Sequence, residues 1–320
     1  MTEISIKKAI PANVIILSGA QVDTSTRVKY NDSNEIPRIT GKIGGKLTTA
    51  WIGVMSRYIK DGKLTWGEML ERTKQTLESD GFHDLLPLLS SSHKFNVQKP
   101  LQLFPNNSKS TIRVLLIGMQ YSQQPKEHQI FHSHSQVEDT RQYLSKYHDV
   151  SFKRMDILTD QKDQVQPTRK NILVGMQKLS RATKPGDSAL VLICGHAGRI
   201  QTKANGEQET LLPIDFKSEG PITQEDIYKH LICSMPAKSN LVCIFDLVES
   251  GSLVDLPLLY KHNQTTDRFN FISNVAFELE LVVGLAIAAA ALGVGASSGD
   301  GNCDDCCPSC CDSILDDLFR

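Results

Sequence analysis

Four short, continuous apolar runs constrain the fold of this chain more than any other feature. They cover residues 14–19, 113–119, 189–196 and 241–246. Strands covered on both faces show such uninterrupted runs, whereas half-exposed strands alternate apolar and polar residues. Amphipathic helical patterns lie between the runs. This alternation predicts an α/β fold with a mostly parallel sheet flanked by helices.

Helical spacing of apolar residues predicts four helices, at 64–82, 135–146, 169–181 and 224–233. Thr168 directly precedes the third of these helices, where a hydroxyl side chain can cap the first turn. Gly81 lies where a glycine commonly ends a helix. The polar segment 24–46 is predicted to be an exposed loop.

The predicted sheet also indicates where a functional site would form. In doubly wound sheets, ligands bind just beyond the carboxyl ends of the parallel strands. The third apolar run ends in Cys194, Gly195 and His196, and the fourth leads into residues 246–249. We therefore expect the chemistry of the chain at these two strand ends.

The net charge and the first residues of the sequence indicate which partners and which cellular location to expect. The formal net charge is −1, which gives no sign of nucleic-acid binding. No long apolar run follows the basic residues near the start, so no secretory signal is predicted and a cytoplasmic location is expected. Cys194, Cys233 and Cys243 are then expected to be reduced core residues.

The end of the chain carries two unusual segments. The uncharged run 281–296 is shorter than the roughly twenty residues of a spanning helix, so membrane association and a buried or flexible Ala-rich segment both stay open. Five cysteines follow within 303–311. Their pairs abut, unlike those of a zinc site, and both lipid modification and adventitious metal binding remain open.

A series of motifs between residues 113 and 260 resembles a known family. The motifs are Leu158-Thr159-Asp160, residues 167–173, residues 185–188, Cys194-Gly195-His196, residues 213–216, residues 244–246 and residues 250–257. In this order they resemble the large catalytic segment of metacaspases, which are caspase-like cysteine peptidases. The resemblance implies a caspase-like sheet and assigns residues 111–262 to this segment.

A second resemblance lies upstream. Residues 17–19, 44–50 and 87–92 are similar to the metacaspase small segment, which assigns 11–104 to it. In the family the small segment follows the large one, whereas here it precedes it. A circular permutation, two neighbouring genes read as one, and an unrelated upstream domain are three explanations of this order. Residues 263–320 form a third region, the apolar segment and the Cys-rich tail.

The resemblance places the catalytic pair at the two strand ends. In the family, the catalytic histidine lies in a Ser-Gly-His-Gly motif and the nucleophilic cysteine lies in an Asp-Ser-Cys-His-Ser-Gly motif. Here the first motif keeps the general base as His196, and the second has Val248 at the nucleophile position. Valine has no proton to lose, and removing a serine-protease nucleophile alone costs on the order of 10⁶ in rate. The chain is therefore predicted to be catalytically inactive, unless Cys194 or Glu249 substitutes.

The substrate pocket implied by the resemblance is also altered. Metacaspases choose Arg or Lys through acidic groups that pair with the substrate cation. Asp246 keeps one acid, whereas the other falls on Gln136 and a neighbouring family cysteine falls on Ser133. Cys194 occupies a further pocket position. A weakened cation pocket is predicted, although Asp246 can equally be a structural acid at a strand end.

Calcium dependence is a further property that the resemblance implies. Calcium takes six to eight oxygen ligands, commonly from several carboxylates. The family's acidic cluster is replaced at 202–207, and Glu225 and Asp255 are the candidate ligands that stay. We therefore expect no cofactor and weak or no calcium binding.

These features predict a pseudopeptidase that binds protein partners, active metacaspases among them. The enzyme alternative is a residual Arg- or Lys-directed endopeptidase with a substitute nucleophile. A third alternative is a misjoined or non-functional gene product.

Overall fold

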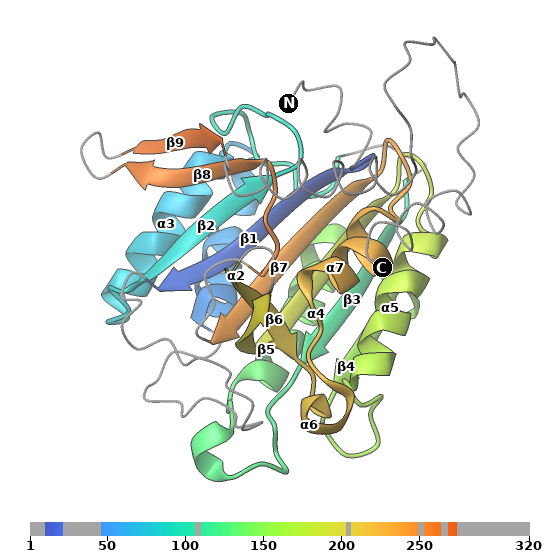
Figure 1. The fold of residues 1–320 in the computed structure, drawn as a ribbon. Helices are drawn as coiled ribbons and strands as arrows, with labels where there is room; N and C mark the ends of the chain where they lie inside the picture. The colour runs from blue at the N-terminus through green and yellow to red at the C-terminus, as the bar shows by residue number, and fades with distance from the viewer. Residues whose placement is uncertain are drawn as a thin grey trace, which may run out of the picture.

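The computed structural model describes residues 10–21, 46–105, 110–202, 206–248, 253–263 and 268–273. Its strands form one sheet in the order β4-β3-β5-β7-β1-β2-β8-β9, with β6 paired to β5 (Figure 1). The strands are β1 (Asn13–Gln21), β2 (Leu85–Ser91), β3 (Ile112–Gly118), β4 (Met155–Thr159), β5 (Ser188–Thr202), β6 (Gly206–Leu212), β7 (Asn240–Val248), β8 (Leu258–Asn263) and β9 (Arg268–Ser273).

Strands β4, β3, β5, β7 and β1 run parallel to one another, and the remaining pairs are antiparallel. The predicted α/β class with a mostly parallel sheet is therefore confirmed. All four predicted strands are present, as β1, β3, β5 and β7.

Helices cover both faces of the sheet (Figure 1). They are α2 (Lys46–Tyr58), α3 (Trp66–Ser79), α4 (Ser133–His148), α5 (Arg169–Ala182), α6 (Phe216–Glu219) and α7 (Gln224–Ile227). One core packs α2, α3 and α4 against Leu190 and Leu192, and the other packs α5 and α7 against Val191 and Ile193. The two faces of one strand thus enter two cores, which explains the uninterrupted apolar runs.

The N-terminal region belongs to the same sheet as the rest of the chain. Strand β1 pairs in parallel with β7, with Leu17 opposite Ile244. The segment that leads from β2 toward β3 packs along α3, where the Leu101 amide donates to the Leu64 carbonyl at 2.6 Å and the Gly67 amide donates to the Val97 carbonyl at 2.9 Å. The two predicted segments therefore share one fold, while their boundaries stay predictions.

Local signals in the sequence account for several helix ends. Thr65 and Glu68 form a capping box at the start of α3, and Gly81 follows this helix with a φ of 86°. Thr168 caps α5, as predicted, by accepting a hydrogen bond from the Asn171 amide. The helix predicted at 224–233 is instead α7 followed by a wider π-helical turn at Tyr228–Ile232.

Several sequence predictions fall outside the described residues. They concern the loop at 24–45, the apolar run 281–296 and the five cysteines of the tail. Within the described ranges, no helix is both long and apolar enough to cross a membrane. Cys194, Cys233 and Cys243 are in no disulfide; Cys194 and Cys243 are buried, as expected, whereas Cys233 is only half-buried.

Candidate active site

The two predicted strand ends lie side by side. Strands β5 and β7 are parallel neighbours, and their register pairs Cys194 with Asp246 and His196 with Val248. The sheet therefore brings the candidate base next to the position that the resemblance assigns to the nucleophile.

The His196 imidazole is held in one orientation by main-chain and aromatic contacts. Its Nε2 lies 2.9 Å from the His128 carbonyl oxygen, and its ring centroid lies 4.7 Å from that of Tyr121. A carbonyl oxygen can only accept, so Nε2 carries the proton and Nδ1 keeps its lone pair in the neutral ring. His196 is 1% exposed, and burial lowers its pKa to about 4. At neutral pH this imidazole is therefore set up as a proton acceptor at Nδ1.

Val248 is the last residue of β7. Residues 249–252 lie outside the described part of the chain. The prediction that Glu249 acts as a substitute base therefore falls on a residue that the structure does not describe.

The acid of the predicted substrate pocket is bound by the chain itself. Asp246 is 4% exposed, and its Oδ2 accepts from the Thr48 main-chain amide at 2.7 Å and from Gln136 Nε2 at 3.3 Å. Thr48 lies in the first turn of α2, where amide groups lack partners within the helix. Burial raises the pKa of Asp246, and the hydrogen bonds oppose this effect. Asp246 thus ties the start of α2 to the end of β7.

The other predicted pocket residues are also buried, and two of them, Gln136 and Cys194, contact Asp246 or Thr48. Gln136 and Ser133 lie one turn apart at the start of α4. Cys194 Sγ lies 3.9 Å from Thr48 Oγ1. The structure thus brings Asp246, Gln136 and Cys194 together, and Thr48, which was not predicted as a pocket residue, lies among them. A guanidinium that approaches Asp246 would have to displace the α2 contact.

Cys194 has the opposite properties to those of a reactive thiol. Its side chain is fully buried, and burial, with the nearby Asp246 charge, raises its pKa well above the ordinary value. A nucleophilic cysteine needs access and a lowered pKa, because the thiolate is the reactive form.

The two predicted calcium ligands make different contacts, one through its side chain and the other through its main chain. Glu225 Oε1 accepts a hydrogen bond from Gln208 Nε2 at 3.0 Å. The main-chain carbonyl of Asp255 accepts from the Tyr228 hydroxyl. Across the described residues, no group of three His, Cys, Asp or Glu side chains is placed to hold a metal ion.

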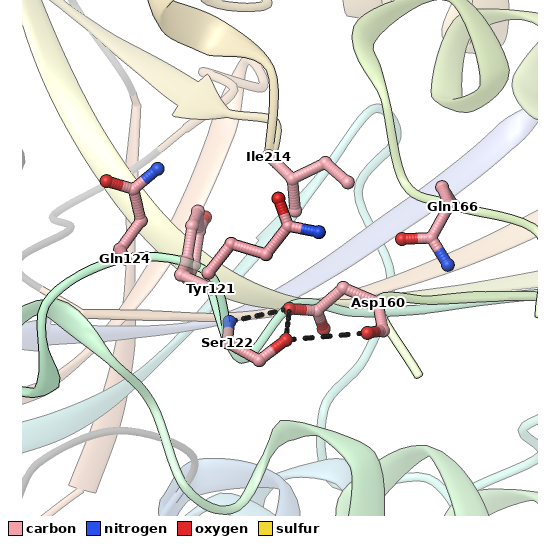
Figure 2. Close-up of a pocket in the computed structure, with 7 residues that line it drawn as sticks. Tyr121, Ser122, Gln124, Asp160, Gln166 and Ile214 are labelled. Atoms are coloured by element: carbon pink, nitrogen blue, oxygen red, sulfur yellow. Dashed lines mark hydrogen bonds between the residues drawn. The ribbon is translucent and has the colours of Figure 1, made fainter. Parts of the chain in front are cut away.

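A polar depression beside Tyr121 was not predicted from the sequence (Figure 2). It is lined by residues 121–124, Asp160, Gln166 and Ile214 and has a volume of about 50 Å³. On its floor, Asp160 accepts from the Ser122 amide at 3.0 Å and from the Ser122 hydroxyl at 3.1 Å. Asp160 also contacts His134, which lies just before the helix predicted at 135–146 and was not singled out from the sequence.

Comparison with known proteins decides the family of this fold and site. The family described as metacaspase, peptidase C14 domain, matches residues 112–257. These residues are a metacaspase domain. The matched range contains both His196 and Val248.

Curated metacaspases are similar to this chain over different lengths. Metacaspase III c of Phaeodactylum tricornutum is 28% identical over 279 residues, which cover 85% of this chain and 82% of that protein. Metacaspase-1 of Coccidioides immitis is 32% identical over 161 residues, covering 48% of this chain and 34% of its own length. Metacaspase-1A of Neurospora crassa is 29% identical over 193 residues, covering 57% and 41%. The chain thus spans less than half the length of these two fungal relatives.

The match to the Phaeodactylum metacaspase is longer than the matched domain. Residues outside 112–257 therefore also align with that metacaspase. Strand β1 lies outside the matched range and pairs with β7 inside it, so the upstream residues and the matched domain share one sheet, while the order of the two segments stays a prediction.

Proposed function

We propose that this chain is a metacaspase-fold protein that does not hydrolyse peptides and acts by binding protein partners, active metacaspases among them. The observation that carries the proposal is an imidazole oriented as a base next to Val248. Without a thiol at that position, no proton transfer to His196 can generate a nucleophile. The strand ends then form a surface that can hold a peptide without cleaving it.

The closed pocket at Asp246 supports the same proposal. Substrate selection by a buried acid requires that the acid be free to pair with the incoming cation. Here the acid bonds to Thr48 and Gln136. The residual-endopeptidase alternative through Cys194 is disfavoured by the burial and the raised pKa of that thiol. We further propose that binding of partners does not depend on calcium.

A binding experiment with purified proteins tests this function. The full-length chain is immobilised, and an active metacaspase from the same cells, with its own nucleophile replaced by alanine, is titrated over it. We expect saturable binding that a Val248→Arg substitution weakens at least about 10-fold, because the charge would have to be desolvated at the interface. Val174→Arg is the matched control, because Val174 is 52% exposed on α5.

Two results would contradict the proposal. The first is the absence of saturable binding by the wild-type chain to the metacaspases of its own cells. The second is equal weakening of binding by Val248→Arg and Val174→Arg, which would mean that the strand ends are not the binding surface.

A further inference from the structure

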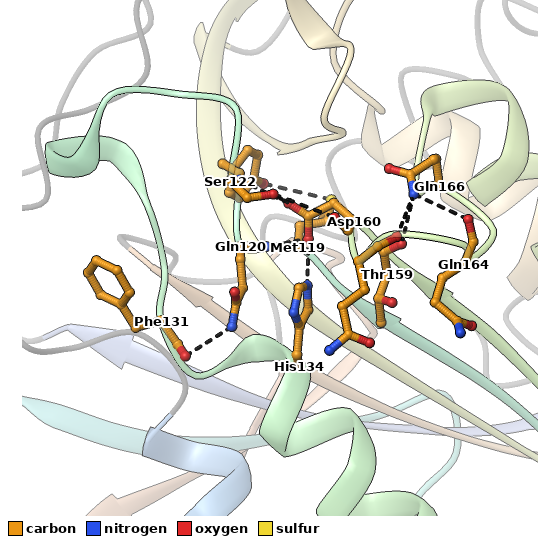
Figure 3. A network of polar contacts seen from close by, with 11 residues as sticks. Met119, Gln120, Ser122, Phe131, His134, Thr159, Asp160, Gln164 and Gln166 are labelled. Carbon is orange, nitrogen blue, oxygen red and sulfur yellow. Dashed lines mark hydrogen bonds and ion pairs between the residues drawn. The ribbon is translucent and has the colours of Figure 1, made fainter.

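The Asp160 carboxylate at the end of β4 joins two segments that lie on either side of it (Figure 3). Its Oδ1 accepts from the Gln120 main-chain amide at 2.8 Å, and its Oδ2 accepts from the Ser122 amide at 3.0 Å. From the other side, His134 Nε2 in the first turn of α4 lies 2.6 Å from Oδ1. The His134 and Asp160 side chains are 11% and 6% exposed. The carboxylate is therefore a largely buried hub between α4 and the turn 120–122.

The residue between the two clamped amides is Tyr121, whose φ is 56°. A residue other than glycine keeps this left-handed conformation only where its surroundings enforce it. The hydrogen bonds from Gln120 and Ser122 to Asp160 supply that constraint. Burial alone would raise the pKa of Asp160, but His134 and the two amides outweigh it and lower the pKa to about 2. The hub thus stays charged at neutral pH.

Tyr121 in turn contacts the strand that carries the base. Its hydroxyl accepts from the His196 amide at 3.0 Å and donates to the Leu212 carbonyl at 2.6 Å. A Cβ atom at Gly195 would lie 3.1 Å from the same hydroxyl, so the absent side chain allows this close approach.

The loop after Tyr121 provides a second contact with His196, in addition to the contact made by Tyr121 itself. The Ile130 amide donates to the Gln120 carbonyl at 3.0 Å, and the Gln129 side-chain amide donates to the Ser122 carbonyl at 3.2 Å. These bonds return the loop to the clamped turn and present the His128 carbonyl to His196 Nε2. The contacts of His196 with Tyr121 and with the His128 carbonyl therefore both come from one loop. Asp160 fixes this loop at the turn 120–122.

We propose that His134 and Asp160 are positioning residues that set the orientation of His196 through the turn 120–122. The inference deepens the proposed function, because it concerns the same imidazole. His134 holds the carboxylate, the carboxylate holds the turn, and the turn holds Tyr121 and the His128 carbonyl against the His196 ring.

Nuclear magnetic resonance of the imidazole in the full-length chain tests this proposal without requiring any activity or partner. Histidines are labelled with ¹³C and ¹⁵N, and the tautomer and pKa of His196 are read in a pH titration. We expect the wild-type ring to be protonated at Nε2 and to titrate near pH 4. In His134→Phe the loop loosens and the ring gains water, so its pKa rises toward the ordinary value of about 6.5 and the single tautomer is lost.

Three further variants make the result specific. Ser122→Ala removes the hydrogen bond from the Ser122 hydroxyl to Asp160 and should raise the His196 pKa by less than His134→Phe does. If His134→Phe does not fold, Ser122→Ala provides the test. His134→Gln keeps a side-chain donor and should restore most of the wild-type titration. His148→Gln is the matched control, because His148 is a half-buried histidine on the same helix whose partner is the Tyr143 hydroxyl at 3.2 Å.

A merely structural role would lower the unfolding midpoint of His134→Phe and leave His196 unchanged. Wild-type tautomer and pKa of His196 in both His134→Phe and Ser122→Ala would overturn the proposal. This outcome is independent of partner binding, so the failure of one proposal can be told from the failure of the other.

Discussion

A Val248→Cys variant is expected to carry a thiol that reacts with iodoacetamide at pH 6 at least about 10-fold faster than an ordinary exposed thiol. The register of β5 and β7 places residue 248 beside His196, whose Nδ1 carries the lone pair of the neutral ring. An unassisted thiol has a pKa of about 8.5 and is almost fully protonated at pH 6. A neighbouring imidazole can take this proton, because the thiolate that forms beside it stabilises the imidazolium and opposes the lowering of the His196 pKa by burial. The thiolate is the reactive form.

A Val174→Cys variant provides the ordinary thiol for comparison, because Val174 is 52% exposed on α5. Mass spectrometry of the alkylated peptides separates the introduced thiols from the native cysteines, and buried Cys194 and Cys243 should react most slowly. The advantage of the thiol at position 248 should shrink near pH 9 and disappear when His196→Ala is added. Equal rates with and without His196 would contradict the orientation of the base.

Replacement of Asp246 by alanine is expected to lower the free energy of unfolding by about 2–4 kcal/mol, because it leaves the buried Thr48 amide and the Gln136 side-chain amide without their acceptor. Asp246→Asn keeps an acceptor oxygen and removes a charge that burial disfavours, as the raised pKa of Asp246 indicates. We therefore expect Asp246→Asn to stay within about 1 kcal/mol of the wild type at pH 7.

Denaturant unfolding of the full-length variants measures this difference. Asp156→Ala is the control, because Asp156 pairs with Lys178 near the surface and such pairs contribute only about 0–1 kcal/mol. A negligible effect of Asp246→Ala would mean that the acid does not hold α2 and that the pocket is open. A large loss in Asp246→Asn would mean that the charge itself is required.

The parallel strands were predictable because the sequence pattern and the environment agree. Strands β3, β5 and β7 are covered on both faces, and each has an uninterrupted apolar run. Strand β4 carries the polar Asp156 among five residues, and β8 and β9 mix apolar with polar residues, so none of the three has the uninterrupted apolar run of a buried strand. The sequence just before helix α2 is rich in glycine and lysine, and the residues of the helix appeared only as part of a family motif.

The site was predictable as far as strand neighbours determine it. His196, Val248, Cys194 and Asp246 come from two adjacent strand ends, where the sheet rule places ligand sites. The contact of Thr48 with Asp246 joins residues 198 positions apart, and no local pattern encodes such a pairing. His134 was missed for a different reason, because a histidine in the first turn of a helix has the pattern of an exposed polar residue. Its partner Asp160 lies 26 residues away on another element.

Hydrolysis of Arg- and Lys-terminated fluorogenic peptides by the purified full-length chain tests the central claim most directly. The assay is run with and without calcium, beside the His196→Ala variant. We expect the wild type to give no turnover above that of His196→Ala under either condition, because Val248 stands where a nucleophile is required. Turnover that His196→Ala abolishes would contradict this claim and would show that another group of the chain attacks the substrate.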